Sequence, residues 1–96
     1  LVEEKALGYH TCAYVGVHFE KGGVYQSVLE NIKQIPEVVE CHYTTGSYGL
    51  LLKIYARDNS HLMQILSHQI QEIPGVSSTE TFISLERPIH RQVTIQ

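Results

Sequence analysis

The fold is decided by a motif that the chain uses twice, IKQIPEV at residues 32–38 and IQEIPGV at residues 70–76. Both copies follow the pattern Ile-x-x-Ile-Pro-x-Val, and an amphipathic segment precedes each of them. A proline cannot continue a helix, and it pushes the residue before it toward an extended conformation. Each copy therefore predicts the end of a helix and the beginning of a strand.

Outward from this motif, two helices are expected, at about residues 24–34 and 59–72. Asp58, Asn59 and Ser60 offer an amino-terminal cap for the second helix, and Gly22-Gly23 lets the chain turn into the first. Apolar residues form one stripe on each helix, and each stripe needs a sheet to pack against. The first stripe holds Val24, Val28, Ile32 and Ile35, and the second holds Leu62, Ile65, Leu66, Ile70 and Ile73.

Four strands are expected, at about residues 11–20, 38–44, 48–57 and 76–86. The turn Thr44-Thr45-Gly46-Ser47 joins the second and third strands in a hairpin. The order strand, helix, strand, strand, helix, strand predicts an α+β fold, the ferredoxin-like βαββαβ sandwich. In this fold a four-stranded antiparallel sheet carries both helices on one face.

The other face of the sheet is predicted to pair with a second copy. On the first strand it presents Cys12, Tyr14, Gly16 and His18, a set too apolar to leave a whole sheet in water. We therefore expect a dimer that resembles a dimeric α/β barrel. The tail after Pro88, in which Val93 and Ile95 alternate with polar residues, either adds a strand to the partner's sheet edge or is a frayed end.

Composition excludes several classes of function. The 96 residues suffice for one core, and no apolar run approaches the roughly 20 residues that span a bilayer, so a cytoplasmic protein without a membrane segment is expected. Seven basic residues against ten acidic ones, a net charge of -3, predict poor nucleic-acid binding by this segment alone. Cys12 and Cys41 form no CxxC pair and are expected to be interior thiols.

The hairpin carries the candidate binding residues. Its exposed turn combines hydroxyl groups with approachable backbone N–H groups, which suits the carboxylate and ammonium groups of an amino acid. Alternatively, the hydroxyls satisfy their own backbone, as they do in many turns. Thr79 and Thr81 lie two apart on the fourth strand, so both can reach one ligand, although threonine is also simply a good strand residue. The hairpin residues are Tyr43, Thr44, Thr45, Gly46, Ser47 and Tyr48.

The sequence contains no recognisable catalytic, metal or cofactor motif. Its six histidines show no HExxH spacing, and neither a nucleophile elbow nor a phosphate-binding glycine loop is present. His61 and His68 on the second helix lack further ligands at suitable spacing, and Glu80 and Glu86 lie beside no evident apolar pocket. We therefore expect a protein that is not an enzyme and needs no cofactor.

In their order and spacing these segments resemble the carboxyl-terminal domain of the leucine-responsive/asparagine-responsive (Lrp/AsnC, feast/famine) transcription regulators. This is the regulation-of-amino-acid-metabolism, or RAM, domain. The similar segments are Leu7-Gly8-Tyr9 at the end of a linker, 35–41 at the second strand, 43–48 at the effector loop, and 73–76, 78–81 and 83–85 at the last helix and strand.

The resemblance implies that residues 1–10 end a linker from an absent helix-turn-helix domain and that 11–96 form the RAM domain. It also implies sheet-to-sheet dimers that assemble further, commonly into octamers, with a small amino-acid effector between dimers and DNA held only by the absent domain. Tyr43 through Tyr48 would then form the effector loop, and Thr79 and Thr81 would line the pocket. Some leucine-type members carry an acidic residue where Gly49 stands here, so the Thr-Thr-Gly-x-Tyr loop is more similar to the asparagine-responsive branch and favours a small polar amino acid.

Three alternatives remain open at this point. An amino-acid-binding ACT-type domain of an allosteric enzyme has the same order of strands and helices, with its ligand near a turn such as Gly22-Gly23. A stand-alone RAM module would lack the DNA-binding half. A small dimeric ferredoxin-like enzyme would require a closed pocket lined by His18 or His42.

Overall fold

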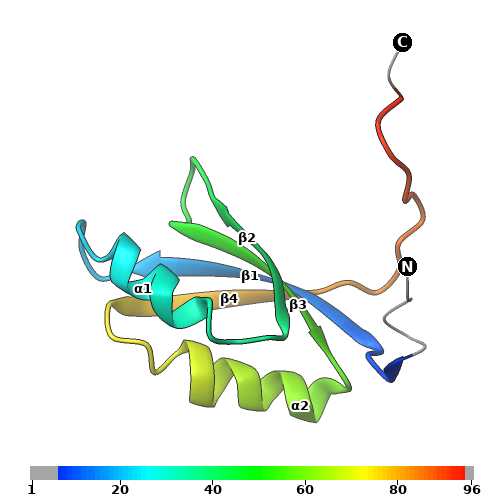
Figure 1. Cartoon of the computed structure of the whole chain (residues 1–96), viewed down its shortest axis with the longest axis horizontal. Helices are drawn as coiled ribbons and strands as arrows, with labels where there is room; N and C mark the ends of the chain where they lie inside the picture. The colour runs from blue at the N-terminus through cyan, green and yellow to red at the C-terminus, as the bar shows by residue number, and fades with distance from the viewer. Residues whose placement is uncertain (1–6, 95–96) are drawn as a thin grey trace.

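The computed structural model describes residues 7–94 and has the predicted order of strands and helices (Figure 1). Residues 1–6 of the expected linker, and Ile95 of the tail, lie outside the described residues. The elements in chain order are β1 (Thr11–Phe19), α1 (Tyr25–Ile32), β2 (Val38–Tyr43), β3 (Leu50–Ala56), α2 (Asn59–Gln64), η2 (Ile65–Ile70) and β4 (Val76–Ile83).

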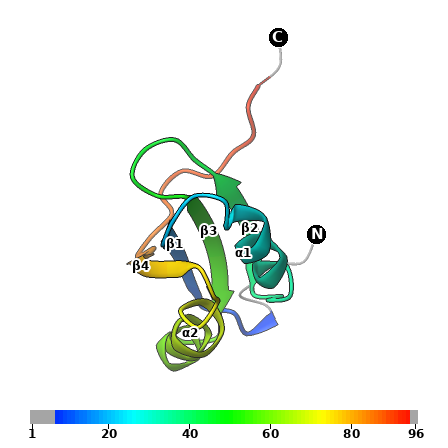
Figure 2. The same cartoon turned by 90° about the vertical axis from the view of Figure 1, so that its left-hand side faces the viewer.

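The four strands form one antiparallel sheet in the order β2-β3-β1-β4. The helices cover one face of this sheet, as Figure 2 shows. The predicted α+β sandwich is therefore confirmed. Because β1 and β3 lie in the middle, β2 and β4 are edge strands at opposite sides of the sheet.

The core lies between the sheet and the helices. Alternate residues of the two central strands are buried there, Ala13, Val15 and Val17 on β1 and Leu50, Leu52, Ile54 and Ala56 on β3. The helices contribute Val28 and Ile32 from α1, with Leu62, Ile65 and Ile70 from the second helical segment. The side chains of β1 that alternate with this set point to the uncovered side, which we call the open face.

The second helical segment departs from the single α-helix expected over 59–72. Asp58 caps it as predicted, its side chain accepting a hydrogen bond of 2.8 Å from the backbone N–H of His61. After Gln64 the chain follows a π-helix, and the N–H of Gln71 donates to the carbonyl of Leu66, five residues earlier. In an α-helix two residues five apart would differ by about 140° around the axis. The wider π turn lets Ile65 and Ile70 both be fully buried.

Several strand ends are shorter than predicted. β3 begins at Leu50 rather than Tyr48, and directly before it the N–H of Gly49 donates to the carbonyl of Val17 on β1. β4 ends at Ile83 rather than Glu86, and the following segment leaves the sheet (Figure 1). The residues before Leu50 are therefore a loop that is free to take its own path.

Candidate ligand-binding loop and open face

The loop between β2 and β3 exposes the middle of its predicted binding sequence. Thr45, Gly46 and Ser47 are exposed, and Gly46 has a φ of +99°, which side chains rarely tolerate. Thr44 closes the loop from within: its hydroxyl donates to the carbonyl of Tyr48 at 3.1 Å. The hydroxyl of Thr44 is thus hydrogen-bonded to the backbone of the loop, whereas the side chains of Thr45 and Ser47 are exposed.

Tyr48 folds back from the loop onto the open face. Its ring lies against Gly16, where a Cβ atom would meet the ring at 2.5 Å, and the ring centre is 4.9 Å from that of His18. Its hydroxyl donates a hydrogen bond to Glu80 on β4. One side chain of the loop therefore spans from β3 across β1 to β4.

The hydrogen bond to Glu80, with desolvation and the negative charge of that carboxylate, raises the pKa of Tyr48. The folded state thus holds the phenol proton more tightly than the unfolded chain does. The contribution of this pair to stability is complete below the ordinary phenol pKa and is lost as the pH rises through the raised value.

We predict that Glu80→Gln returns the pKa of Tyr48 toward its ordinary value, because the amide carries no charge. Titration of the ring resonances of Tyr48 by NMR would measure this. A Tyr48 titration that is identical in Glu80→Gln would contradict the proposed contact.

Phe19 holds the other end of the loop. Its ring lies so close to Gly49 that a Cβ atom there would meet ring carbons at 2.4 Å. The N–H of Gly49 also donates to the carbonyl of Val17 at 2.9 Å. An acidic side chain at position 49 would therefore need Phe19 to move, which is a physical reason for the glycine.

Tyr43 points away from Tyr48. Its ring stacks on that of Tyr25 from α1, with ring centres 4.5 Å apart and planes 22° apart. Because β2 pairs Tyr43 with the buried Leu50, Tyr43 belongs to the helix side of the sheet. The two tyrosines that flank the loop, Tyr43 and Tyr48, therefore lie on opposite faces of the sheet.

Thr79 and Thr81 share one face, as the strand alternation predicts. They pair with Val17 and Val15, whose side chains are in the core, so both threonines face the helix side at the β4 edge. The hydroxyl of Thr79 accepts a hydrogen bond of 3.1 Å from Gln71. Within one chain, β3 and β1 separate these threonines from the hairpin at β2, so the eight predicted site residues do not form one cluster.

The four residues predicted for a dimer interface do lie together on the open face. Their strand partners place six further residues beside them: Leu51, Lys53, Tyr55, Ser78, Glu80 and Phe82. The sequence analysis missed these six, because the run Leu50-Leu51-Leu52 hides which side of β3 is covered. Tyr14 and Phe82, paired side by side, are exposed apolar groups on this face.

Charges at one side of the open face compensate each other. Glu40 lies 2.9 Å from His42 and 3.8 Å from the amino group of Lys53, and the hydrogen bond from His42 is the main reason that the pKa of Glu40 is lowered. Burial acts to lower the pKa of Lys53, but the nearby phenols of Tyr55 and Tyr14 and the Glu40 carboxylate outweigh it and raise that pKa. Glu40 and Lys53 thus compensate each other's charge at this side of the open face.

Within residues 7–94 the structure contains no group of three or more His, Cys, Asp or Glu side chains placed to hold a metal ion. In the same part of the chain no helix is long and apolar enough to cross a membrane. The candidate binding features of the described residues are therefore the loop between β2 and β3, the partly apolar open face, and the two edge strands.

The chain matches the Lrp/AsnC ligand binding domain over residues 12–94. It belongs to the Lrp/AsnC family. The regulatory protein AsnC of Haemophilus influenzae is 36% identical over 93 residues, which cover 97% of this chain and 62% of that protein. The chain thus spans somewhat less than two thirds of the length of this curated relative.

Solved structures agree with this assignment. The structure of Escherichia coli AsnC has a TM-score of 0.93 and 35% identity, covering 97% of this chain and 62% of that one. A transcriptional regulator of Neisseria meningitidis in complex with L-methionine has a TM-score of 0.87 at 18% identity, covering 94% of this chain and 59% of that one, which shows a shared fold. The AsnC relatives of Haemophilus influenzae and Escherichia coli are named regulatory proteins rather than enzymes, which favours the regulator over the ACT-type and small-enzyme alternatives.

Proposed function

We propose that this chain is the ligand-sensing and oligomerisation domain of an Lrp/AsnC-type transcription regulator. It binds a small amino acid at a subunit boundary and so modulates DNA binding by an attached helix-turn-helix domain. The family match, and the 62% of the length of the AsnC relative that this chain covers, support a ligand-binding domain that is separate from the DNA-binding domain. In this proposal residues 1–10 are the end of the linker between them. The excess of ten acidic over seven basic residues is also consistent with DNA contact through another domain. The cytoplasmic location expected from the sequence stays a prediction.

The observation that carries the proposal is the exposed, firmly anchored turn at residues 45–47. Hydrogen bonds of Thr44 and Gly49 and the packing of Tyr48 fix the base of the loop. A fixed base lowers the entropy that a ligand must remove on binding. Backbone N–H groups near Gly46 would bind the ligand's carboxylate, and the hydroxyls of Thr45 and Ser47 would accept from its ammonium group.

The proposed pocket lies at a subunit boundary because, within a single chain, the candidate residues of the loop and those of β4 lie apart. Thr79 and Thr81 sit at the β4 edge, and the strands β1 and β3 lie between them and the opposite edge strand, β2. A hairpin from one subunit and a β4 edge from another can complete a pocket that neither has alone. We propose Tyr43, Thr44, Thr45, Gly46, Ser47 and Tyr48 from the loop, with Thr79 and Thr81 from β4, as the lining of this pocket.

We also propose that the open face pairs with its copy in a homodimer and that the dimers assemble further, into the octamer that is common in the family. Cys12, Tyr14, Gly16 and His18 form the centre of this interface, with Phe82 and Leu51 beside them. Burying exposed aromatic groups on such a face gains roughly 25 cal/mol for each Å² removed from water.

Regulation would then be thermodynamic rather than catalytic. An amino acid that binds at a boundary between subunits stabilises the assembly that contains the complete pocket. Couplings of this kind are typically about 1 to 3 kcal/mol, enough to change operator occupancy several-fold or more. For the ligand we favour a small polar amino acid, on the similarity to AsnC; methionine, bound by the Neisseria regulator, is the second choice.

Calorimetric titration of the protein with the twenty amino acids tests the proposal. We expect binding of one or a few of them, weakened about tenfold, or 1.4 kcal/mol, when Thr45→Val and Ser47→Ala are combined. Ser27→Ala, which removes an exposed hydroxyl from α1, serves as the matched control and should leave binding unchanged. Absence of heat with every amino acid at millimolar concentration would speak against ligand sensing by this domain.

A further inference from the structure

Three aromatic rings pack together on the helix side of the sheet, at the base of the β2–β3 loop. The ring of Tyr25, the first residue of α1, stacks on that of Tyr43, and the ring of Phe19 meets Tyr25 in a T-shaped arrangement with ring centres 6.4 Å apart. We call these three rings the aromatic cluster. Because Phe19 also lies against Gly49, the cluster connects the residue that ends β2 with the residue that precedes β3. A residue of α1 thus links the two ends of the loop.

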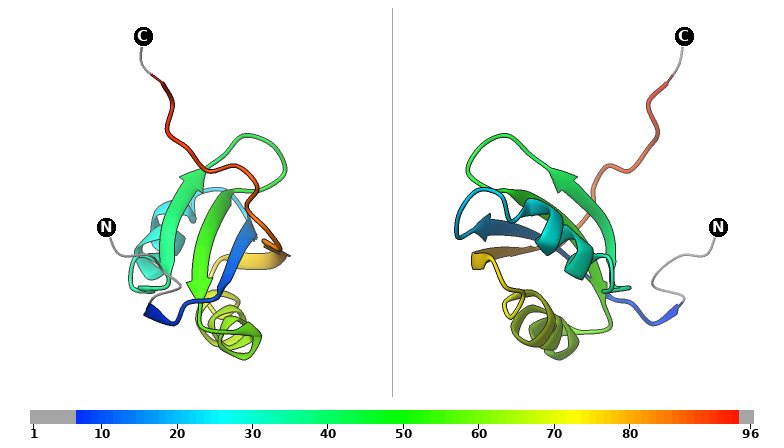
Figure 3. Two further views of the ribbon diagram at one scale, coloured as in Figure 1. Left: turned by 90° about the vertical axis from the view of Figure 1, so that its right-hand side faces the viewer. Right: turned by 60° about the vertical axis from the view of Figure 1, so that its left-hand side comes forward.

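The topology of the sheet brings the start of α1 to this loop. Because neighbouring strands are antiparallel, β1 and β2 both end at the end of the sheet where β3 and β4 begin. The connection from β1 to α1 therefore lies at the same end of the sheet as the β2–β3 loop (Figures 1 and 3). Tyr25 directly follows this connection, which places it beside a loop that is distant in the sequence.

The start of α1 has a fixed position. Gly23 has a φ of +87° and lets the chain turn directly before the helix. Val24 packs closely on Gly75, where a Cβ atom would meet it at 3.2 Å, and the N–H of Glu20 donates to the carbonyl of Gly75 at 2.8 Å. The residues on both sides of this turn are thus fixed to the segment that leads into β4. Tyr25 is therefore a rigid support for the ring that stacks on it.

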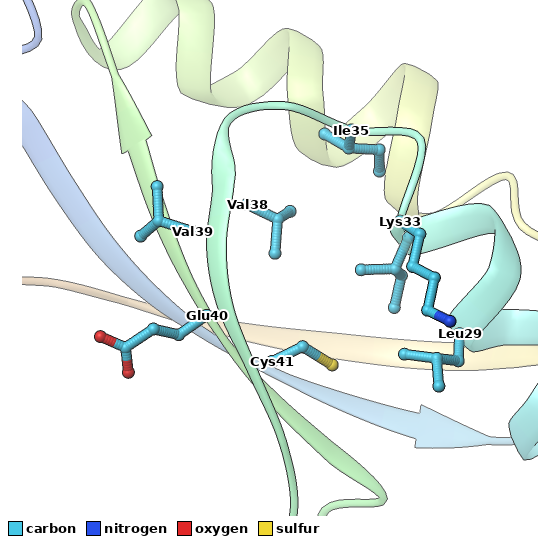
Figure 4. A pocket seen from close by; sticks show the side chains of 8 residues that line it. Leu29, Lys33, Ile35, Val38, Val39, Glu40 and Cys41 are labelled. Carbon is cyan, nitrogen blue, oxygen red and sulfur yellow. The ribbon is translucent and has the colours of Figure 1, made fainter.

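Farther along α1 the helix and β2 are less closely packed. A groove of about 260 Å³ lies between them, lined by Leu29 and Lys33 from the helical side and by Val38 and Cys41 from β2 (Figure 4). Because this groove separates the helix from the strand, the middle of α1 gives little support to the end of β2. The stack at the start of the helix therefore determines the position of Tyr43.

The ring of Tyr43 has a surface that a ligand can contact. Although stacked on one side, Tyr43 is 69% exposed. It lies two residues before Thr45 and on the helix side of the sheet, the side that Thr79 and Thr81 also face. The face of a phenol ring is electron-rich, so it contacts an uncharged group favourably and a carboxylate unfavourably. Such a wall suits an amino acid whose side chain carries no negative charge.

We infer that Tyr25 is a positioning residue of the ligand-binding loop: its stack holds the exposed ring of Tyr43 as the wall of the pocket that contacts the side chain of the bound amino acid. The inference rests on the proposed ligand-sensing function and deepens it, because it adds a residue of α1 to the site and specifies an uncharged ligand side chain. Tyr25 acts through Tyr43 and needs no contact with the ligand itself.

Mobility of the Tyr43 ring tests the support without any ligand. By NMR relaxation of the full chain, the ring should be as ordered as a rigid backbone, with an order parameter of about 0.85, and should fall below about 0.6 in Tyr25→Ala. Tyr25→Phe should keep the ring ordered, because stacking needs the ring and not the hydroxyl. Gln26→Ala, which shortens the next, exposed side chain of α1, is the matched control. A Tyr43 ring that is equally ordered in Tyr25→Ala and Gln26→Ala would overturn the inference.

Calorimetry then tests the wall. L-asparagine and L-methionine, the two ligands favoured above, are compared with L-aspartate and L-glutamate, whose side chains are of similar length but charged. The better uncharged ligand should bind the natural chain at least about tenfold more tightly than either acid, and about tenfold more weakly when Tyr25→Ala removes the preorganised ring. Tyr25→Phe should restore the natural affinity, a rescue that general destabilisation of the fold does not explain. Tyr25→Leu, which keeps apolar bulk against the core, provides the same comparison if the alanine variant does not fold.

Two results separate this inference from the proposed function. Binding of an uncharged amino acid that is unchanged in Tyr25→Ala and Tyr25→Leu, or that is no tighter than binding of the acids, would overturn the inference and leave ligand sensing intact. No binding of any of the twenty amino acids by the natural chain would overturn the proposed function and with it the ligand wall. In that case the mobility of the ring still decides whether Tyr25 positions Tyr43.

Discussion

Gly16→Val is expected to dislodge Tyr48 from the open face and thereby to disturb both the loop and the proposed dimer interface. The new side chain would occupy the space of the Tyr48 ring, which meets the Cβ position of residue 16 at 2.5 Å. Overpacking of this kind costs about 1–3 kcal/mol of unfolding free energy. If the loop binds an amino acid, a loss of 1.4 kcal/mol in positioning weakens that binding about tenfold. Chemical denaturation and calorimetric titration would measure the two effects.

A double variant separates the clash from other effects of the valine. Tyr48→Ala removes the ring, so Gly16→Val should cost much less in that background than in the natural one. Ligand binding should stay weak in the double variant, because the loop has lost its anchor. An equal cost of Gly16→Val in both backgrounds would show that Tyr48 does not pack on Gly16.

Ile70→Ala is expected to have the largest effect on stability. Ile70 is fully buried in the π-helical segment, and removing it leaves a cavity between that segment and the sheet. Such substitutions cost about 2–5 kcal/mol. A domain of this size is stable by only about 5–15 kcal/mol, so a large part of the total is lost. Denaturation with urea, followed by circular dichroism, would measure the change.

The neighbouring residue provides the control for this prediction. Gln69→Ala shortens an exposed side chain on the same turn and should change stability by no more than about 0.5 kcal/mol. Similar losses for Ile70→Ala and Gln69→Ala would mean that Ile70 does not occupy the core as described here.

The repeated Ile-x-x-Ile-Pro-x-Val motif was sufficient to predict the order of helices and strands, because proline acts on local backbone geometry. The π-helix could not be predicted. In the sequence, Ile65, Leu66, Ile70 and Ile73 also match a broad apolar stripe of an α-helix, with Ile65 and Ile70 at its two edges. Only packing against the sheet, which buries both edges fully, distinguishes the two kinds of helix. Local chemistry thus determined where elements end, and tertiary packing determined how the second helix winds.

The candidate site was predictable in composition but not in arrangement. The hydroxyl-rich turn is visible in the sequence, yet the path of Tyr48 over Gly16 depends on contacts between distant segments. The face taken by Thr79 and Thr81 was equally hidden, since the stretch Ser77-Ser78-Thr79-Glu80 shows no apolar alternation. Only the pairing of β4 with β1 determines it.

The packing of Phe19 on Gly49 also constrains how this branch of the family can diversify. A side chain at position 49 would meet the ring of Phe19, so that ring would have to move. A smaller residue at position 19 would remove this clash, and a carboxylate at position 49 should therefore be tolerated best together with such a change. In a set of homologous sequences, these two sites should covary as a matched pair, and a shift in effector preference along this route should pass through a phenylalanine replacement first.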